Sequence, residues 1–246
     1  RWFESHLDKF NLSYSNRSDE YHGLSIAGPN SRKVLEKIVR DDVSNEKFKF
    51  RDSRRMFVGG VPAIINRISF TGELGYEIYV APHYQLKLYE ELMEAGKEFN
   101  IKPFGGRALM SMRLEKNWGA WTLDYRPDFT AKETGLDAFI NWDKEFIGKE
   151  SAQKENSSNK LVPLIVETNE IDVTNNEAVL NGDQSIGYVT SGGFAHFVNK
   201  SVAFTFVDQK KIKSENKIQV EINGDLFNCS IIKEPLYDPS GQKMRS

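Results

Sequence analysis

Residues 67–79 read RISFTGELGYEIY and say more about the fold than any other segment of the chain. Apolar and aromatic residues before Gly72 and after Gly75 predict two strands joined by a tight turn, because glycine accepts the backbone angles that such turns need. Side chains alternate along a strand, so Glu77 and Tyr79 share one face of the second strand. The segment therefore predicts a hairpin that presents a carboxylate and an aromatic ring together.

The sequence on both sides of this hairpin follows the order strand, helix, paired strands, helix. That order is typical of an α+β layer, in which helices cover one face of an antiparallel sheet. Gly59 and Gly60 separate two apolar runs and predict a further hairpin. The expected elements are a strand at 24–27, a helix capped by Asn30, strands at 56–58, 61–69 and 76–80, and helices near 88–96 and 107–116.

A second part of the chain follows a polar stretch that has no periodicity. Residues 154–160 predict a linker. Beyond them, short strands with spaced turns predict a small barrel or sandwich, and Asn223-Gly224 is a strong hairpin signal because both residues tolerate positive φ. We place the domains at residues 1–153 and 160–246. The expected strands lie at 161–166, 185–190, 201–207, 217–222 and 226–232.

The composition is that of a globular protein without a strong charge. The net charge is −2, with 33 Lys and Arg against 35 Asp and Glu, so we expect neither a nucleic acid nor a membrane as a partner. No apolar run reaches the roughly 18 residues of a membrane helix. Cys229 is the single cysteine; it fits a reducing compartment, and we expect a cytoplasmic protein. The four histidines are widely spaced, so no metal site is expected.

The Glu77 carboxylate has two interpretations. Beside aromatic rings it could accept two parallel hydrogen bonds from the amidine-like edge of a planar heterocycle. A glutamate after a hairpin turn is more often a solvated surface residue. The residue types alone favour the second interpretation.

Residues 70–77, FTGELGYE, resemble the signature of the glycine-cleavage T-protein, or aminomethyltransferase, family. The resemblance implies an α+β fold, with a folate-binding aminomethyltransferase-like core followed by a small C-terminal antiparallel β barrel. It implies tetrahydrofolate as the cofactor, with Glu77 binding the pterin ring and Phe70 lining its pocket, although the family more often has Tyr at the position of Phe70. Other segments that resemble the family, in the same order, are GLSIAGPNS (23–31), RLEK (113–116), GL (135–136), FIGKE (146–150) and IGYVTSGGF (186–194).

Details of the sequence are closer to the folate domain of dimethylglycine and sarcosine dehydrogenases, in which a flavin domain precedes the folate domain. The sequences of residues 72–75 and 113–116 are closer to those of these dehydrogenases than to those of the T-protein. Leu109 occupies the position at which the T-protein has a folate-contacting Arg. The chain begins with Arg1 rather than Met, so we expect an N-terminally truncated fragment. The resemblance places the catalytic Asp before Arg1, and the catalytic residues within this chain are therefore unknown. FAD is expected only in an upstream domain.

The implied function is tetrahydrofolate-dependent one-carbon transfer, as the C-terminal part of a dimethylglycine or sarcosine dehydrogenase-like protein. Its small-molecule partners are then folate and an iminium derived from a methylamine, with an upstream flavin domain, and the fragment by itself is expected to lack activity. One alternative is a glycine-cleavage system aminomethyltransferase. Another is a folate-binding or scaffolding module without catalysis, because Leu109 and Met110 replace an Arg-Asp pair of the T-protein.

Overall fold

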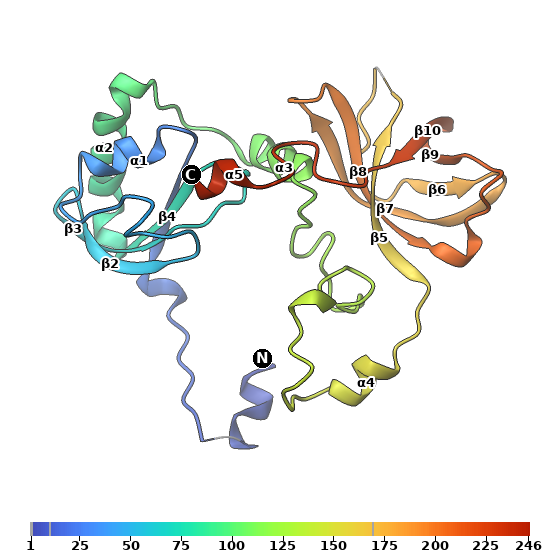
Figure 1. Cartoon of the computed structure of the whole chain (residues 1–246), viewed down its shortest axis with the longest axis horizontal. Coiled ribbons are helices and arrows are strands. Elements are labelled where there is room, and N and C mark those ends of the chain that lie inside the picture. The colour runs from blue at the N-terminus through green and yellow to red at the C-terminus, as the bar shows by residue number, and fades with distance from the viewer. Residues whose placement is uncertain (1, 10, 169) are drawn as a thin grey trace. The chain divides into compact units, whose positions relative to one another are not determined.

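The computed structural model describes residues 2–9, 11–168 and 170–246 (Figure 1). Contacts divide the chain into two compact units. The first unit comprises Arg1–Ser69, Glu73–Pro103 and Lys243–Ser246, and the second comprises Phe70–Gly72 and Phe104–Gln242. The predicted domain bounds, 1–153 and 160–246, stay a prediction.

The first unit is a four-stranded antiparallel sheet with two helices. The strand order is β1-β4-β3-β2, so β4 lies inside the sheet between β1 and β3. The strands are β1 (His22–Ala27), β2 (Ser53–Val58), β3 (Val61–Asn66) and β4 (Gly75–Val80), and the helices are α1 (Ser31–Glu36) and α2 (Gln85–Gly96).

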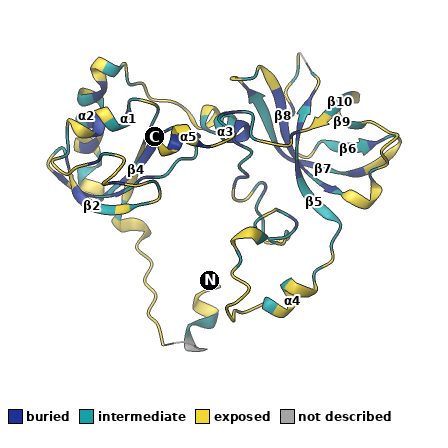
Figure 2. Cartoon of the chain, viewed as in Figure 1, coloured by how far each residue is buried: buried dark blue, intermediate teal, exposed yellow. Residues whose placement is uncertain are grey.

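The alternation of side chains along these strands separates a buried face from an open one. Tyr76, Ile78 and Val80 on β4 are fully buried and belong to one core with Leu35 of α1 and Leu88 of α2. The dark strands and helix faces in Figure 2 show this core. The helices therefore cover one face of the sheet, and Glu77 and Tyr79 lie on the opposite face.

The far end of the chain contributes to the same unit. Residues Lys243–Ser246 belong to it, and the Ser246 carbonyl accepts hydrogen bonds of 2.7 Å from the Nη2 atoms of Arg32 and Arg67. Arg67 is fully buried and also donates to the Phe48 carbonyl at 2.5 Å. These contacts hold the C-terminal residues to the sheet's own unit.

The second unit contains a closed antiparallel barrel. The barrel order is β10-β5-β8-β7-β6-β9, and its interior is lined by β-branched and other apolar side chains such as Val166, Val189 and Val220. Its strands are β5 (Asn159–Val166), β6 (Ala178–Asn181), β7 (Gln184–Ala195), β8 (Lys200–Asp208), β9 (Ile218–Ile222) and β10 (Asp225–Ile231). The helices α3 (Gly106–Glu115) and α4 (Lys149–Lys154) precede the barrel, and α5 (Gln242–Arg245) follows it.

Short 3-10 turns complete the secondary structure. They are η1 (Glu4–Lys9), η2 (Ser18–Glu20), η3 (Pro82–Tyr84), η4 (Lys97–Phe99), η5 (Asp137–Phe139) and η6 (Gln209–Lys211). None of the helices in the described residues is long and apolar enough to cross a membrane.

The predicted fold class, an α+β core followed by a small antiparallel β barrel, is confirmed. Some local predictions were wrong. The polar stretch 154–160 is not a linker throughout, since α4 ends at Lys154 and β5 begins at Asn159. Strand β6 was not predicted, and the side chain of Asn30 makes no capping hydrogen bond to α1.

Candidate functional site

Glu77 lies in the middle of β4, on the open face of the first unit's sheet. Its cross-strand neighbours are Ser25 on β1 and Asn66 on β3, and both lie on the same face because paired residues of an antiparallel ladder point the same way. Ser25 is exposed, and Glu77 and Asn66 are half-buried. Three polar side chains therefore form one row across three strands, with a carboxylate at its centre.

The Tyr79 hydroxyl holds one oxygen of the Glu77 carboxylate. It donates a hydrogen bond of 2.6 Å to Oε2 of Glu77. This bond, then burial, then the negative charge of Glu77 raise the pKa of Tyr79 to about 12. Among the described residues, no donor reaches the second oxygen, Oε1. The arrangement fixes the direction of the carboxylate and leaves an acceptor for a ligand.

Gly23 makes room for the Tyr79 ring. The two residues are cross-strand partners, and a Cβ at Gly23 would lie 2.9 Å from Cε1 of Tyr79. Real Cβ atoms do not approach a ring carbon so closely, so any larger residue would displace the ring. The missing side chain of Gly23 thus contributes to the position of Glu77 through Tyr79.

Phe70 belongs to the second unit, not to the unit that holds Glu77. Its ring is stacked with that of Trp118, with centroids 6.4 Å apart and planes at 16°. The Lys116 ammonium lies 5.7 Å from the centre of the Trp118 ring and donates to the Asp238 carbonyl at 2.6 Å. Phe70 is therefore part of an aromatic surface in its own unit, and its role in binding folate stays a prediction.

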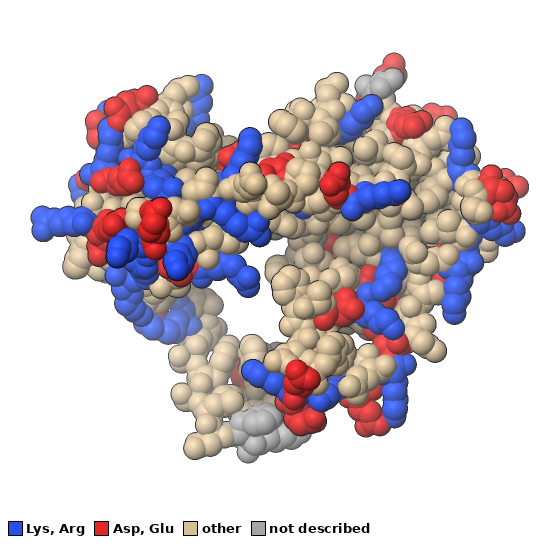
Figure 3. Space-filling view, viewed as in Figure 1, with Lys and Arg blue, Asp and Glu red and all other residues tan. Residues whose placement is uncertain are grey.

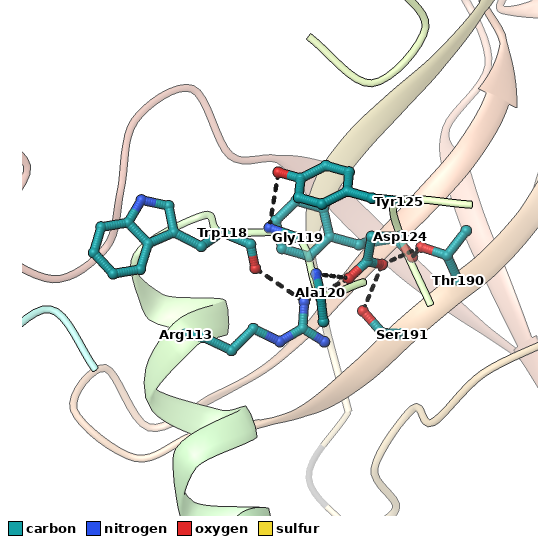
Figure 4. Close-up of polar contacts among 9 residues, drawn as sticks. Arg113, Trp118, Gly119, Ala120, Asp124, Tyr125, Thr190 and Ser191 are labelled. Carbon is teal, nitrogen blue, oxygen red and sulfur yellow. Dashed lines mark hydrogen bonds and ion pairs between the residues drawn. The ribbon is translucent and has the colours of Figure 1, made fainter. Parts of the chain in front are cut away.

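A buried polar cluster joins α3 to the barrel strand β7 (Figure 4). Arg113 and Asp124 form an ion pair of 2.6 Å, and their side chains are 1% and 0% exposed. The Asp124 carboxylate also accepts hydrogen bonds from the Ala120 amide, the Thr190 hydroxyl and the Ser191 hydroxyl. Each Asp124 oxygen accepts from two protein donors, so no acceptor site of this carboxylate is left for a ligand. The cluster therefore holds α3 and β7 together and is not a ligand site.

Glu115, the other charged residue of the Arg-Leu-Glu segment, has a similar role. Its carboxylate accepts a hydrogen bond of 2.6 Å from the Phe197 amide, and its burial raises its pKa above the usual range. Arg113 and Glu115 are thus both held by contacts within the second unit.

A cavity of about 480 Å³ lies within the second unit, beside α4. Neither Glu77 nor Phe70 lines it. Its lining residues include Thr130, Lys132, Ile140, Trp142 and Ala152.

Charges of both signs are interspersed on the face of the molecule that Figure 3 shows. This agrees with the balance of 33 basic and 35 acidic residues. Among the residues that the structure describes, no three His, Cys, Asp or Glu side chains are grouped so that they could hold a metal ion.

Comparison with known proteins identifies the family. The model of the GCVT N-terminal domain matches residues 1–144, and the model of the glycine cleavage T-protein C-terminal barrel domain matches residues 159–238. The chain belongs to the glycine-cleavage T-protein family. The second match covers the whole closed barrel, from the beginning of β5 to the end of β10.

Relatives of this family member include two kinds of enzyme. Dimethylglycine dehydrogenase, mitochondrial, of Homo sapiens is 35% identical over 243 residues, which are 96% of this chain and 28% of the relative. Aminomethyltransferase of Thermoanaerobacter pseudethanolicus is 30% identical over 248 residues, 99% of this chain and 67% of the relative. The chain thus spans about 28% of the length of the dehydrogenases that it matches.

A solved structure has the same fold. The glycine cleavage system aminomethyltransferase T from Bartonella henselae matches with a TM-score of 0.76 and 22% identity, over 89% of this chain and 60% of that one. At this identity the match supports the shared fold of the family.

Sequence reasoning placed Tyr79 on the strand face of Glu77 but gave it no role as a hydrogen-bond partner, and it gave no role to Gly23 or Asp124. The first two had a usable signal, because residues 77 and 79 share a strand face and a glycine in a facing strand leaves space for a ring. Asp124 had none, since it reaches Arg113 and β7 from an irregular segment.

Proposed function

We propose that this chain binds tetrahydrofolate and serves one-carbon transfer as the C-terminal part of a dimethylglycine or sarcosine dehydrogenase-like protein. The observation that carries the proposal is the Glu77 carboxylate, which lies on an open sheet face with one oxygen held by Tyr79 at 2.6 Å. Membership of the T-protein family and 35% identity to dimethylglycine dehydrogenase support it.

Glu77 would bind the pterin through its amidine-like edge, whose two N–H groups match a carboxylate. An upstream flavin domain would oxidise an N-methyl amine to an iminium. Tetrahydrofolate would capture the methylene carbon through N5 and N10 as 5,10-methylenetetrahydrofolate, while the C–N bond to the amine breaks and the demethylated amine and a proton are released. The capture step moves no electrons, so the residues of this chain have to position the folate and exclude competing geometries. Phe70 would offer a flat apolar surface to the ring system.

The test is the affinity of the Glu77→Gln variant for tetrahydrofolate, measured by calorimetry. We expect binding to weaken by about 1.5–3 kcal/mol, the range for a hydrogen bond to a charged group. Glu90→Gln, at an exposed position of α2, is a matched control that should bind as the unaltered protein does. An unchanged affinity in Glu77→Gln would remove Glu77 from the site.

A glycine-cleavage aminomethyltransferase is the second candidate, favoured by the match to 67% of the Thermoanaerobacter protein. Turnover of dimethylglycine or sarcosine by the full-length protein, with formation of methylenetetrahydrofolate, separates the two, because the aminomethyltransferase requires a lipoyl carrier instead. A non-catalytic folate module would bind folate and turn over neither substrate. A cytoplasmic location is part of the proposal for this chain, whereas the human relative is named as mitochondrial.

A further inference from the structure

The open face of the first unit's sheet carries more than the Glu77 row. Two residues further along the strands, Tyr79 on β4, Ile64 on β3 and Arg55 on β2 form a second row. The opposite side chains of β2, such as Met56 and Val58, are buried under the helices. Arg55 therefore shares the face of Glu77, two strands away.

Arg55 differs from its neighbour Arg54. The Arg54 guanidinium pairs with Asp52 at 3.2 Å and lies 5.1 Å from the centre of the Phe48 ring. Arg55 is exposed, and no hydrogen bond or ion pair to another described residue holds its guanidinium. Arg54 therefore makes its contacts within the first unit, whereas the guanidinium of Arg55 is available to a ligand.

The spacing of the two rows gives the distance between the charges. Strands lie about 4.8 Å apart and residues rise about 3.4 Å, so two strands and two residues place the Cα atoms of Glu77 and Arg55 about 12 Å apart. Half-buried Ile64 and half-buried Asn66 flank the diagonal between them, one on either side. The line from Glu77 past Ile64 to Arg55 therefore carries a carboxylate, an aliphatic side chain and a cation in this order.

We propose that this line, Glu77–Ile64–Arg55, binds the whole length of a folate, with Arg55 taking the carboxylates of its glutamate tail. The proposal rests on the proposed function. The order of chemistry in the ligand is the same: a pterin edge that donates hydrogen bonds, an apolar p-aminobenzoyl ring, and an anionic glutamate. Arginine presents a planar fork of donors that matches a carboxylate. Additional γ-linked glutamates would extend the anionic tail from this point.

The experiment compares three ligands by calorimetry with the protein and its Arg55→Gln variant. They are 5-formyltetrahydrofolate, its γ-linked triglutamate, and the same pterin and benzoate without glutamate. We expect Arg55→Gln to weaken binding of the two glutamate-bearing ligands about tenfold, the effect of losing one charged hydrogen bond at an exposed site. Binding of the ligand without glutamate should change less than about twofold, within the usual effect of a surface substitution.

Two variants serve as controls. Arg54→Gln removes the same charge from the same strand on the other side of the sheet, and its affinities for all three ligands should equal those of the unaltered protein. Arg55→Lys should recover part of the lost affinity, because a single ammonium keeps the charge without the fork. Higher salt should weaken binding of the triglutamate most, and this salt dependence should be smaller in Arg55→Gln.

The outcomes separate this inference from the proposed function. If Glu77→Gln weakens binding of every ligand while Arg55→Gln weakens none, Arg55 does not bind the tail and the folate function stands. Equal weakening of all three ligands by Arg55→Gln would also overturn the tail contact. If Glu77→Gln leaves every affinity unchanged, the proposed function fails, and the line through Arg55 fails with it.

Discussion

Replacing Glu77 by glutamine should lower the pKa of Tyr79 from about 12 towards its ordinary value of about 10. The Tyr79 hydroxyl donates to Oε2 of Glu77 at 2.6 Å, and deprotonation of the tyrosine would remove this donor and place a second negative charge beside the carboxylate. Glutamine keeps an acceptor oxygen of the same shape but removes the charge. The substitution therefore isolates the electrostatic part of the contact.

The magnitude follows from the pKa. A difference of about two pH units corresponds to roughly 2.7 kcal/mol between the protonated and deprotonated forms. Both side chains are only half-buried, so solvent screens the interaction, and we expect about 1 kcal/mol of net stability from it. Because the folded-state pKa lies above the unfolded one, this stability is present below about pH 10 and disappears as the pH rises to about 12.

The assay is a pH titration of tyrosine Cζ resonances by NMR, with Tyr79 assigned through the Tyr79→Phe variant. Urea unfolding of both proteins between pH 8 and 12 gives the accompanying stability, and the difference between them should decrease towards high pH. A Tyr79 pKa that stays near 12 in Glu77→Gln would refute the reasoning, because burial alone would then account for the raised value.

Other contacts lead to further expectations. Gly23→Ala should displace the Tyr79 ring and weaken folate binding roughly threefold to tenfold, by about one kcal/mol, with little change in melting temperature; calorimetry that finds full affinity would contradict the role of Gly23. Asp124→Asn should destabilise the second unit by about 3–5 kcal/mol, because it leaves the Arg113 charge buried without its partner; urea unfolding measures this, and a loss below about 1 kcal/mol would show that the cluster is dispensable. Half-buried Cys229 has a pKa raised to about 12 by burial, so only about one thiol in ten thousand is ionised at pH 8; a thiol reagent at pH 8 should modify the native protein far more slowly than the unfolded one, and equally rapid modification of both would contradict the raised pKa.

The sequence predicted those elements whose residues have a clear period. Strand β4 was predicted because Tyr76, Ile78 and Val80 alternate with polar residues, and the helix near 107–116 lies within one residue of α3. The four residues of β6 are too few to show a pattern. The polar sequence KESAQK of α4 has no apolar stripe, so its helix could not be distinguished from the linker after it.

The candidate site could be predicted in part. Glu77 was found from its motif, and its face of the strand followed from the alternation of side chains. The partner at Tyr79 depends on rotamers, and the open position at Gly23 depends on strand order, which the sequence does not reveal directly. Asp124 meets Thr190 and Ser191 across more than sixty residues, and no local pattern encodes a contact at that separation.

The return of the C-terminal residues to the first unit has a consequence for how the protein is assembled. During synthesis the sheet of β1 to β4 emerges well before the barrel, yet the Ser246 carbonyl that accepts from Arg32 and Arg67 emerges after it. Until then, the Nη2 atoms of Arg32 and Arg67 have to rely on water, while Arg32 donates to the Val43 carbonyl and Arg67 to the Phe48 carbonyl within the unit. The barrel is in this sense an insertion within the first unit, and a nascent chain completes the sheet's unit only after the barrel has been made.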